Sequence, residues 1–320
     1  MIAAPKSLAE VVWTPDLVAE LEAASAAIAA LEASVSNSLL LRVWQTRAAL
    51  SGYAAALRLQ HEPLDEIDVF SHFCGIKLPG REPVETTSEA FSGFAEWEKQ
   101  LSDASQRHWR EDVSFSFDLP PGWEGAPRLL KALCLLQAWA WHDHSQRAWL
   151  QLPIILRQTG VTGEVLPCLV AGHNGLRKRR QDAPSLIMQL LKRLRASAKT
   201  AHYRYAMMEE TLIRFSAVLR EMPRPGRLAD LGTLLLVEPV LSPRKVSERL
   251  DLTISGAGRL LERAADQGIV SEISGRETWR VYATKDMAYA LELNIERRGR
   301  PQRMPDPPTH LRPTFSSLAS

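Results

Sequence analysis

The stretch from Ser242 to Thr284 constrains the fold of this chain most tightly. It begins with Ser242 and Pro243, a typical helix start, because serine accepts hydrogen bonds from the free amides of a first turn and proline suits the first helical position. Thr253 is a suitable cap for a second helix, in which apolar residues recur at helical spacing. Two short helices with a turn of about three residues between them predict a helix-turn-helix.

A β-hairpin is expected directly after the second helix. Gly268 supplies a left-handed residue that ends the helix. Two runs of alternating apolar residues, 269–273 and 279–283, then flank a turn at 275–277. Such a hairpin is the wing of a winged helix, and Arg276 lies at its tip.

The pattern of the second helix predicts which of its side chains meet a partner. We expect an inward stripe of Ile254, Ala257, Leu260, Leu261 and Ala264. Ser255, Gly256 and Arg259 then point outward near the N-terminal end, where recognition helices contact bases, and Arg259 suits a guanine edge. Gly256 and Gly258 either let the helix backbone approach DNA closely or simply pack within the domain. The DNA contacts predicted in this domain are Ser242, Arg244, Lys245, Thr253, Ser255, Gly256, Arg259, Arg263 and Arg276.

These hydroxyl and cationic side chains favour double-stranded DNA as the partner. They lie at both helix starts and at the wing tip, the three places where phosphates would be contacted. The simplest function is a transcriptional regulator that contacts the major groove with the helix 253–267. Winged helices also bind proteins, so the alternative is a non-catalytic adaptor whose winged domain mediates protein–protein contacts.

Charge is divided unevenly along the chain. Residues 1–175 contain 13 Lys and Arg against 21 Asp and Glu, whereas residues 176–320 contain 26 against 16. The basic second half is expected to meet a polyanion. Cations gather on a predicted helix from 184 to about 199, where they form either a solvated surface or a supplementary phosphate track.

The whole chain is expected to be mainly α-helical. A helical domain of unknown function spans residues 1–222, a Pro- and Gly-containing linker spans 223–227, and the winged domain spans 228–296, starting with a helix at 228–237. The acidic front half offers apolar helix faces through which residues 1–175 are expected to form a homodimer. The elements predicted in the first domain are helices within 15–60, 64–75, 87–101, 127–143, 184–199 and 201–222, and a lone strand at 113–117.

Nothing in the sequence predicts catalysis, a cofactor or a metal site. The chain contains no phosphate-binding loop, dinucleotide fingerprint, nucleophile elbow or HExxH motif, so we expect no enzyme activity. His142, Asp143 and His144 are adjacent and do not share a helical face, so they do not form a ligand set. No apolar run is long enough for a membrane span, and a cytoplasmic location is expected. The sequence indicates no effector ligand. Three separated cysteines without a CxxC pair are expected to be buried thiols: Cys74, Cys134 and Cys168.

Residues 297–320 are rich in proline and are expected to form a disordered tail. At its start lies Arg298-Gly299-Arg300-Pro301, which resembles the core of an AT-hook. Arg298 and Arg300 would then enter the narrow minor groove of A·T-rich DNA, where the negative potential is focused. The alternative is a merely basic tail.

From His144 onward the chain resembles a largely uncharacterised bacterial family of the kind often met on rhizobial plasmids. Members of this family carry a domain of unknown function followed by a helix-turn-helix DNA-binding domain. The Thr-Gly-Arg wing of the family is Ser-Gly-Arg here, and its paired-arginine linker is reduced to Arg224 and Arg227. The resemblance implies DNA binding and implies neither an effector nor a target gene. The segments that carry it are His144–Leu150, Leu166–Leu169, Gly175–Arg177 and the predicted winged domain with Ser274–Arg276 and Trp279.

Overall fold

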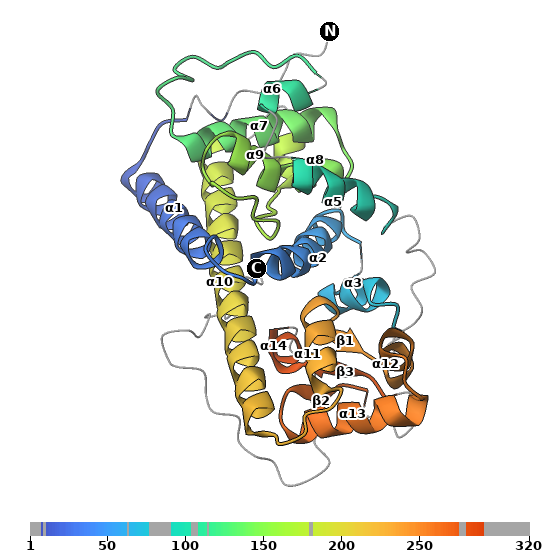
Figure 1. Ribbon diagram of the computed structural model, residues 1–320. Helices are drawn as coiled ribbons and strands as arrows, with labels where there is room; N and C mark the ends of the chain where they lie inside the picture. Colours follow the sequence, from blue (N-terminus) through green and yellow to red (C-terminus); the bar gives the residue numbers. More distant parts are fainter. Residues whose placement is uncertain are drawn as a thin grey trace. The chain divides into compact units, whose positions relative to one another are not determined.

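The described part of the chain is mainly helical, with one small antiparallel sheet, which confirms the predicted mainly α class (Figure 1). A computed structural model describes residues 8, 11–62, 64–76, 91–103, 108–113, 115–178, 182–274 and 280–290 of the 320 residues. Within these ranges, no helix combines the length and the apolar character that crossing a membrane requires.

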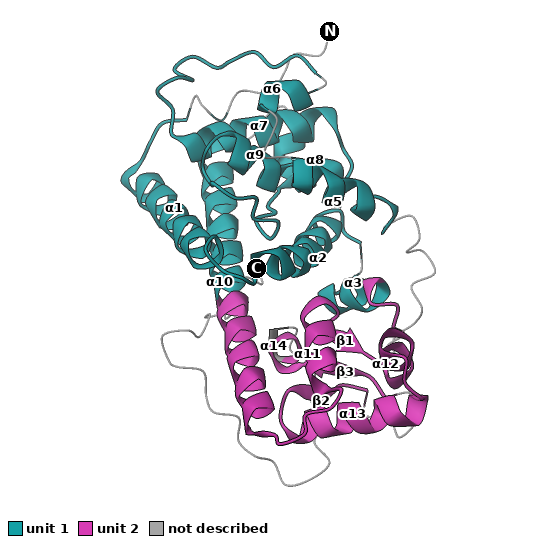
Figure 2. Ribbon diagram, in the orientation of Figure 1, with its two compact units in different colours: residues 1–72, 82–202 teal, residues 73–81, 203–320 magenta. Residues whose placement is uncertain are grey.

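The chain divides into two compact units, coloured separately in Figure 2. Unit 1 comprises residues 1–72 and 82–202, and unit 2 comprises residues 73–81 and 203–320. The division falls within one helix, α10 (Ala183–Glu221), whose second half belongs to unit 2. The linker predicted at 223–227 therefore lies inside unit 2, and the predicted domain bounds stay a prediction.

Helices make up unit 1, and its first helix shows why they form where they do. Thr14 has an extended backbone and its hydroxyl accepts a hydrogen bond from the Leu17 amide at 3.3 Å, while Pro15 takes the first helical position. Before α10, the helical elements are α1 (Pro15–Val35), α2 (Leu41–Leu59), α3 (Glu66–Phe73, which ends at the boundary with unit 2), α5 (Phe94–Asp103), α6 (Trp109–Asp112), α7 (Arg128–His142), α8 (Arg147–Leu150), α9 (Leu152–Gln158) and the 3₁₀ helix η2 (Asn174–Arg177).

Two expectations for the first 222 residues are wrong. The two helices expected at 184–199 and 201–222 are one continuous α10 of 39 residues. No glycine or proline interrupts the junction, and Ala198 and Ala201 continue the buried stripe through it. The described residues of the run 113–117 form no strand. A lone strand would leave its backbone hydrogen-bonding groups unpaired. Aromatic packing holds the segment in place instead, because the Phe115 ring packs edge-on against the Trp139 ring with 5.3 Å between the ring centroids.

Unit 2 contains the sheet and the remaining helices. The two runs predicted as a hairpin pair antiparallel, with Val270 opposite Thr284 and Glu272 opposite Tyr282. A third strand, β1 (Val240–Leu241), which the sequence did not predict, pairs with the other side of the second strand of the hairpin. The first strand of the hairpin is β2 (Val270–Glu272) and the second is β3 (Tyr282–Thr284), so the strand order is β1-β3-β2. The elements are α11 (Leu228–Val237), β1 (Val240–Leu241), α12 (Pro243–Leu250), α13 (Ile254–Asp266), β2 (Val270–Glu272), β3 (Tyr282–Thr284) and α14 (Lys285–Ala290).

The core of unit 2 includes the second half of α10. Phe215 of α10 is buried in the same cluster as Leu231 of α11 and Leu261 of α13. Gly232 of α11 makes this packing close, since a Cβ there would lie 1.8 Å from the Phe215 ring. Val218 and Leu219 pack against the same cluster from the last turn of α10, as does Met222 directly after the helix. The second half of α10, which precedes the predicted winged domain, therefore forms one side of the core of unit 2.

Candidate nucleic-acid interface

The α12–turn–α13 segment is built by local capping, as the sequence predicted. The Ser242 hydroxyl accepts a hydrogen bond from the Lys245 amide at 3.3 Å, and the Thr253 hydroxyl accepts one from the Gly256 amide at 3.1 Å. Asp251 ends α12 in a left-handed conformation with φ of 51°. The Ser247 hydroxyl closes the turn by donating to the Leu252 carbonyl at 2.5 Å. Since a capping hydroxyl keeps its own proton, Ser242 and Thr253 remain possible donors to a phosphate.

One face of α13 anchors the helix, and the opposite face is exposed. Ala257, Leu261 and Ala264 are fully buried. Ser255 and Arg259 are exposed, as expected for residues that meet a partner. Ile254, which we expected to face inward, is 60% exposed. The inward prediction was wrong because Ile254 is the first residue of α13, and the buried stripe of the helix begins only one turn later, at Ala257.

The glycines of α13 differ in their surroundings. A Cβ on Gly256 would lie 3.1 Å from the capping oxygen of Thr253, so this glycine leaves room for the cap. A Cβ on Gly258 would meet no atom within 4 Å. The space beside Gly258 is open to a partner, and internal packing does not require a glycine there.

The arginines of unit 2 differ in whether they already have partners. Arg259 makes no hydrogen bond or ion pair with any described residue. Arg263 donates to the Arg224 carbonyl at 3.2 Å and contacts the Met222 sulfur at 3.1 Å, so it ties α13 to the segment after α10. Arg244 pairs with Glu248 at 3.1 Å, and both side chains are more than half exposed. Such an exposed pair contributes about 0–1 kcal/mol, so a phosphate can replace the carboxylate at little cost.

The other predicted contacts are placed as follows. Lys245 is half-buried, and its ammonium group would lie 3.4 Å from a Cβ on Gly75, at the start of unit 2. Arg276, Arg298 and Arg300 fall outside the described residues, and their roles stay predictions. Three of the predicted cations are therefore placed on or beside the α12–α13 segment with their head groups unpaired or only weakly paired among the described residues: Arg244, Lys245 and Arg259.

The base of the hairpin is fixed to α13 by Arg280, which no pattern in the sequence marks. Arg280 pairs with Glu262 of α13 at 2.5 Å and lies 4.0 Å from Glu272 of β2. It also donates a hydrogen bond to Tyr282, which lowers the pKa of the Tyr282 hydroxyl. Burial outweighs this lowering and raises the pKa, so the hydroxyl stays neutral. The Val281 amide donates to the Ser274 hydroxyl at 3.2 Å. These contacts hold Ser274 and Arg280, the described residues on either side of the predicted wing tip, in place.

The basic part of α10 in unit 1 is largely used within the unit. Arg195 pairs with Glu20 of α1 at 2.9 Å, and Glu20 is buried. Arg193 donates to the Gly172 carbonyl. Lys192 and Lys199 are exposed. Arg193 and Arg195 thus help to hold unit 1 together, while Lys192 and Lys199 stay at its surface, and both interpretations of the remaining cations stay predictions.

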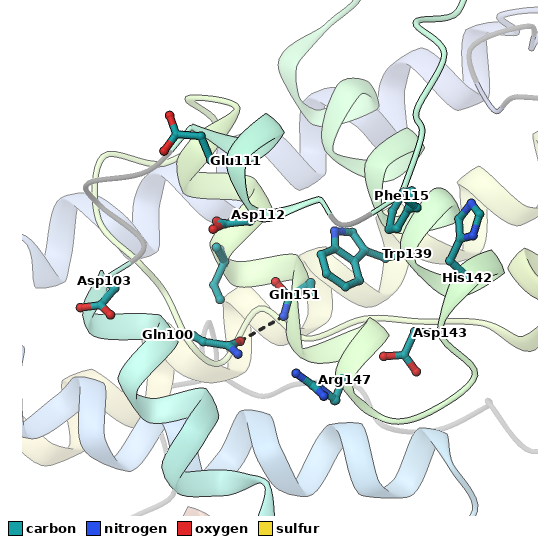
Figure 3. Close-up of a pocket in the computed structure, with 11 residues that line it drawn as sticks. Gln100, Asp103, Glu111, Asp112, Phe115, Trp139, His142, Asp143, Arg147 and Gln151 are labelled. Atoms are coloured by element: carbon teal, nitrogen blue, oxygen red, sulfur yellow. Dashed lines mark hydrogen bonds between the residues drawn. The ribbon is translucent and has the colours of Figure 1, made fainter.

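A cavity of about 550 Å³ lies in unit 1, and its chemistry does not suit nucleic acid (Figure 3). Four carboxylates line it against one guanidinium, that of Arg147, which already pairs with Glu96 at 3.1 Å. His142 stacks on Phe115 at 4.2 Å. The described residues contain no group of three His, Cys, Asp or Glu side chains placed to hold a metal ion. The lining residues are Gln100, Asp103, Glu111, Asp112, Phe115, Trp139, His142, Asp143, Arg147, Gln151 and Ile154.

Comparison with models of protein families and with curated proteins finds no match to this chain. The resemblance to the bacterial family with a C-terminal helix-turn-helix therefore stays a prediction from the residues quoted above.

Proposed function

We propose that this protein binds double-stranded DNA as a transcriptional regulator, with α12 and α13 as a helix-turn-helix and β2–β3 as a wing. The observation that carries the proposal is the exposed face of α13. Ser255 and Arg259 project from its N-terminal half, and Arg259 has no partner among the described residues. The opposite face of α13 is buried in the core, so the helix holds this long cationic side chain in a fixed direction. Such a side chain is suited to insertion into the DNA major groove, where base edges present hydrogen-bond acceptors.

In this proposal each element has one role. α13 enters the major groove, and Arg259 donates two hydrogen bonds to the O6 and N7 atoms of a guanine. Arg244 and Lys245, in the first turn of α12, neutralise phosphates, and the capping hydroxyls of Ser242 and Thr253 donate to phosphate oxygens. The open space beside Gly258 admits the sugar–phosphate backbone or a base edge without a clash.

The proposal is tested on the full-length protein with duplexes selected from a random-sequence pool. Arg259→Ala should lose about 1–3 kcal/mol of binding free energy at one base pair and tolerate all bases there. Arg244→Ala should weaken every duplex about equally and lower the slope of log affinity against log salt by about 1. Arg214→Ala on α10 is the matched control, since this exposed arginine pairs with Glu210 of its own helix, is not among the proposed contacts and should change neither quantity.

Two results would count against the proposal. Failure to retain any duplex at about 50 mM salt would remove DNA as the partner and leave the protein-binding adaptor. A uniform loss of affinity for all duplexes in Arg259→Ala would show that α13 does not contact bases. Regulation itself is tested by placing the selected site next to a promoter and measuring transcription with and without the protein.

A further inference from the structure

Ile254 is an exposed apolar side chain at the start of α13, between two exposed hydroxyl residues. It is 60% exposed, while Thr253 and Ser255 on either side are exposed as well. The helix is capped by Thr253 and anchored by residues from Ala257 onward, so neither cap nor core needs an isoleucine at this position. A β-branched residue is also a weaker helix former than alanine or glutamine. The fold therefore gives no reason for this side chain.

The position of Ile254 is informative because it lies next to the residues that carry the proposed function. The first residues of a recognition helix are the ones that contact base edges in the major groove. Among the groups that base pairs present there, the C5 methyl of thymine is the apolar one. An isoleucine that is left in water in the free protein gains from burial against that methyl group.

We infer that Ile254 contacts the methyl group of a thymine and so helps to determine the sequence that the protein binds. The inference rests on the proposed function and adds a second specificity contact to that of Arg259. The two residues are five positions apart, which corresponds to a rise of about 7.5 Å along α13. They also differ by about 140° in direction around the helix axis, so the two side chains contact different base pairs, which are stacked about 3.4 Å apart.

The test removes the methyl group from DNA without changing hydrogen bonds. Each thymine of a selected duplex is replaced in turn by deoxyuridine, and the dissociation constant of the full-length protein is measured for each duplex. One of these thymines should lie close to the guanine at which Arg259→Ala loses its base preference. At that position the wild type should bind the deoxyuridine duplex about four-fold more weakly than the thymine duplex, as expected for one buried methyl group.

The same pair of duplexes is then measured with Ile254→Ala and Ile254→Val. Ile254→Ala should bind the thymine duplex as weakly as the wild type binds the deoxyuridine duplex, and should not distinguish the two. Ile254→Val should keep part of the difference. Since Ile254 is exposed and alanine is the better helix former, neither variant should unfold at a markedly lower temperature than the wild type, which excludes misfolding as the cause.

The outcomes separate this inference from the function on which it rests. If the wild type selects a sequence but no deoxyuridine replacement weakens binding, or if Ile254→Ala keeps the wild-type difference, the thymine contact is wrong and DNA binding stands. If no duplex is bound specifically, the proposed function and the thymine contact are overturned together.

Discussion

Gly232→Ala tests whether α10 is built into the core of unit 2. The new Cβ would lie 1.8 and 1.9 Å from two carbons of the buried Phe215 ring, far inside van der Waals contact. Either the ring or α11 must move, and overpacking of this kind costs about 1–3 kcal/mol. Alanine is the better helix former by about 1 kcal/mol, which offsets part of the cost. We therefore expect unit 2 to lose up to about 2 kcal/mol of stability.

The measurement is hydrogen exchange of the α11 amides, because a chain of two units need not unfold in a single transition. The matched control is Gly258→Ala on α13, where the new Cβ meets no atom within 4 Å and the gain in helix propensity should raise protection. Phe215→Leu combined with Gly232→Ala should recover part of the loss, because the smaller side chain makes room. Increased α11 protection in Gly232→Ala alone would refute the packing of Phe215 on α11.

Three further predictions concern a helix cap, a histidine and the tail. Thr253→Ala should cost about 1 kcal/mol in thermal unfolding of unit 2, whereas Thr253→Ser should cost little, because only the serine can still cap α13. His173 has its pKa lowered below the ordinary 6.5 by burial and then by nearby cations, so the unfolded chain takes up the proton first and stability falls as pH drops below 6.5. Between about pH 7.5 and pH 5.5, the melting temperature of His173→Asn should therefore decrease less than that of the wild type. An equal decrease in both proteins would show that other groups cause the loss of stability. Arg298→Ala with Arg300→Ala should weaken binding to A·T-flanked sites more than to G·C-flanked ones, and an equal loss on both probes would indicate a merely basic tail.

The parts of unit 2 that could be predicted are those determined by neighbouring residues. Ser242 and Thr253 begin α12 and α13 because a cap acts within one turn, and such a signal is visible in the sequence. The two runs of the hairpin alternate between apolar and polar residues over several positions, and this pattern of neighbouring residues is likewise visible in the sequence. β1 is only two residues long, too short for any alternation, and only its pairing with β3 reveals it.

The features that could not be predicted depend on residues far apart in the chain. Arg263 and Arg259 lie one helical turn apart on α13, and the sequence gives no reason to treat them differently. Only the contacts of Arg263 with Met222 and Arg224, about forty positions away, show that Arg263 holds the fold together while Arg259 is left for a partner. The exposure of Ile254 likewise follows from where the core ends, because its spacing alone fits the inward stripe. In both cases helical periodicity gives the direction of a side chain, and the fold decides what lies in that direction.

The packing of Phe215 has a consequence for limited proteolysis. Residues 223–227, with two prolines and a glycine in a non-helical segment, are a natural site for a protease to cut. A cut there would not free the C-terminal portion, because Phe215, Val218 and Leu219 of α10, and Met222 directly after it, are held in its core. The two pieces should migrate together under native conditions and separate only in denaturant.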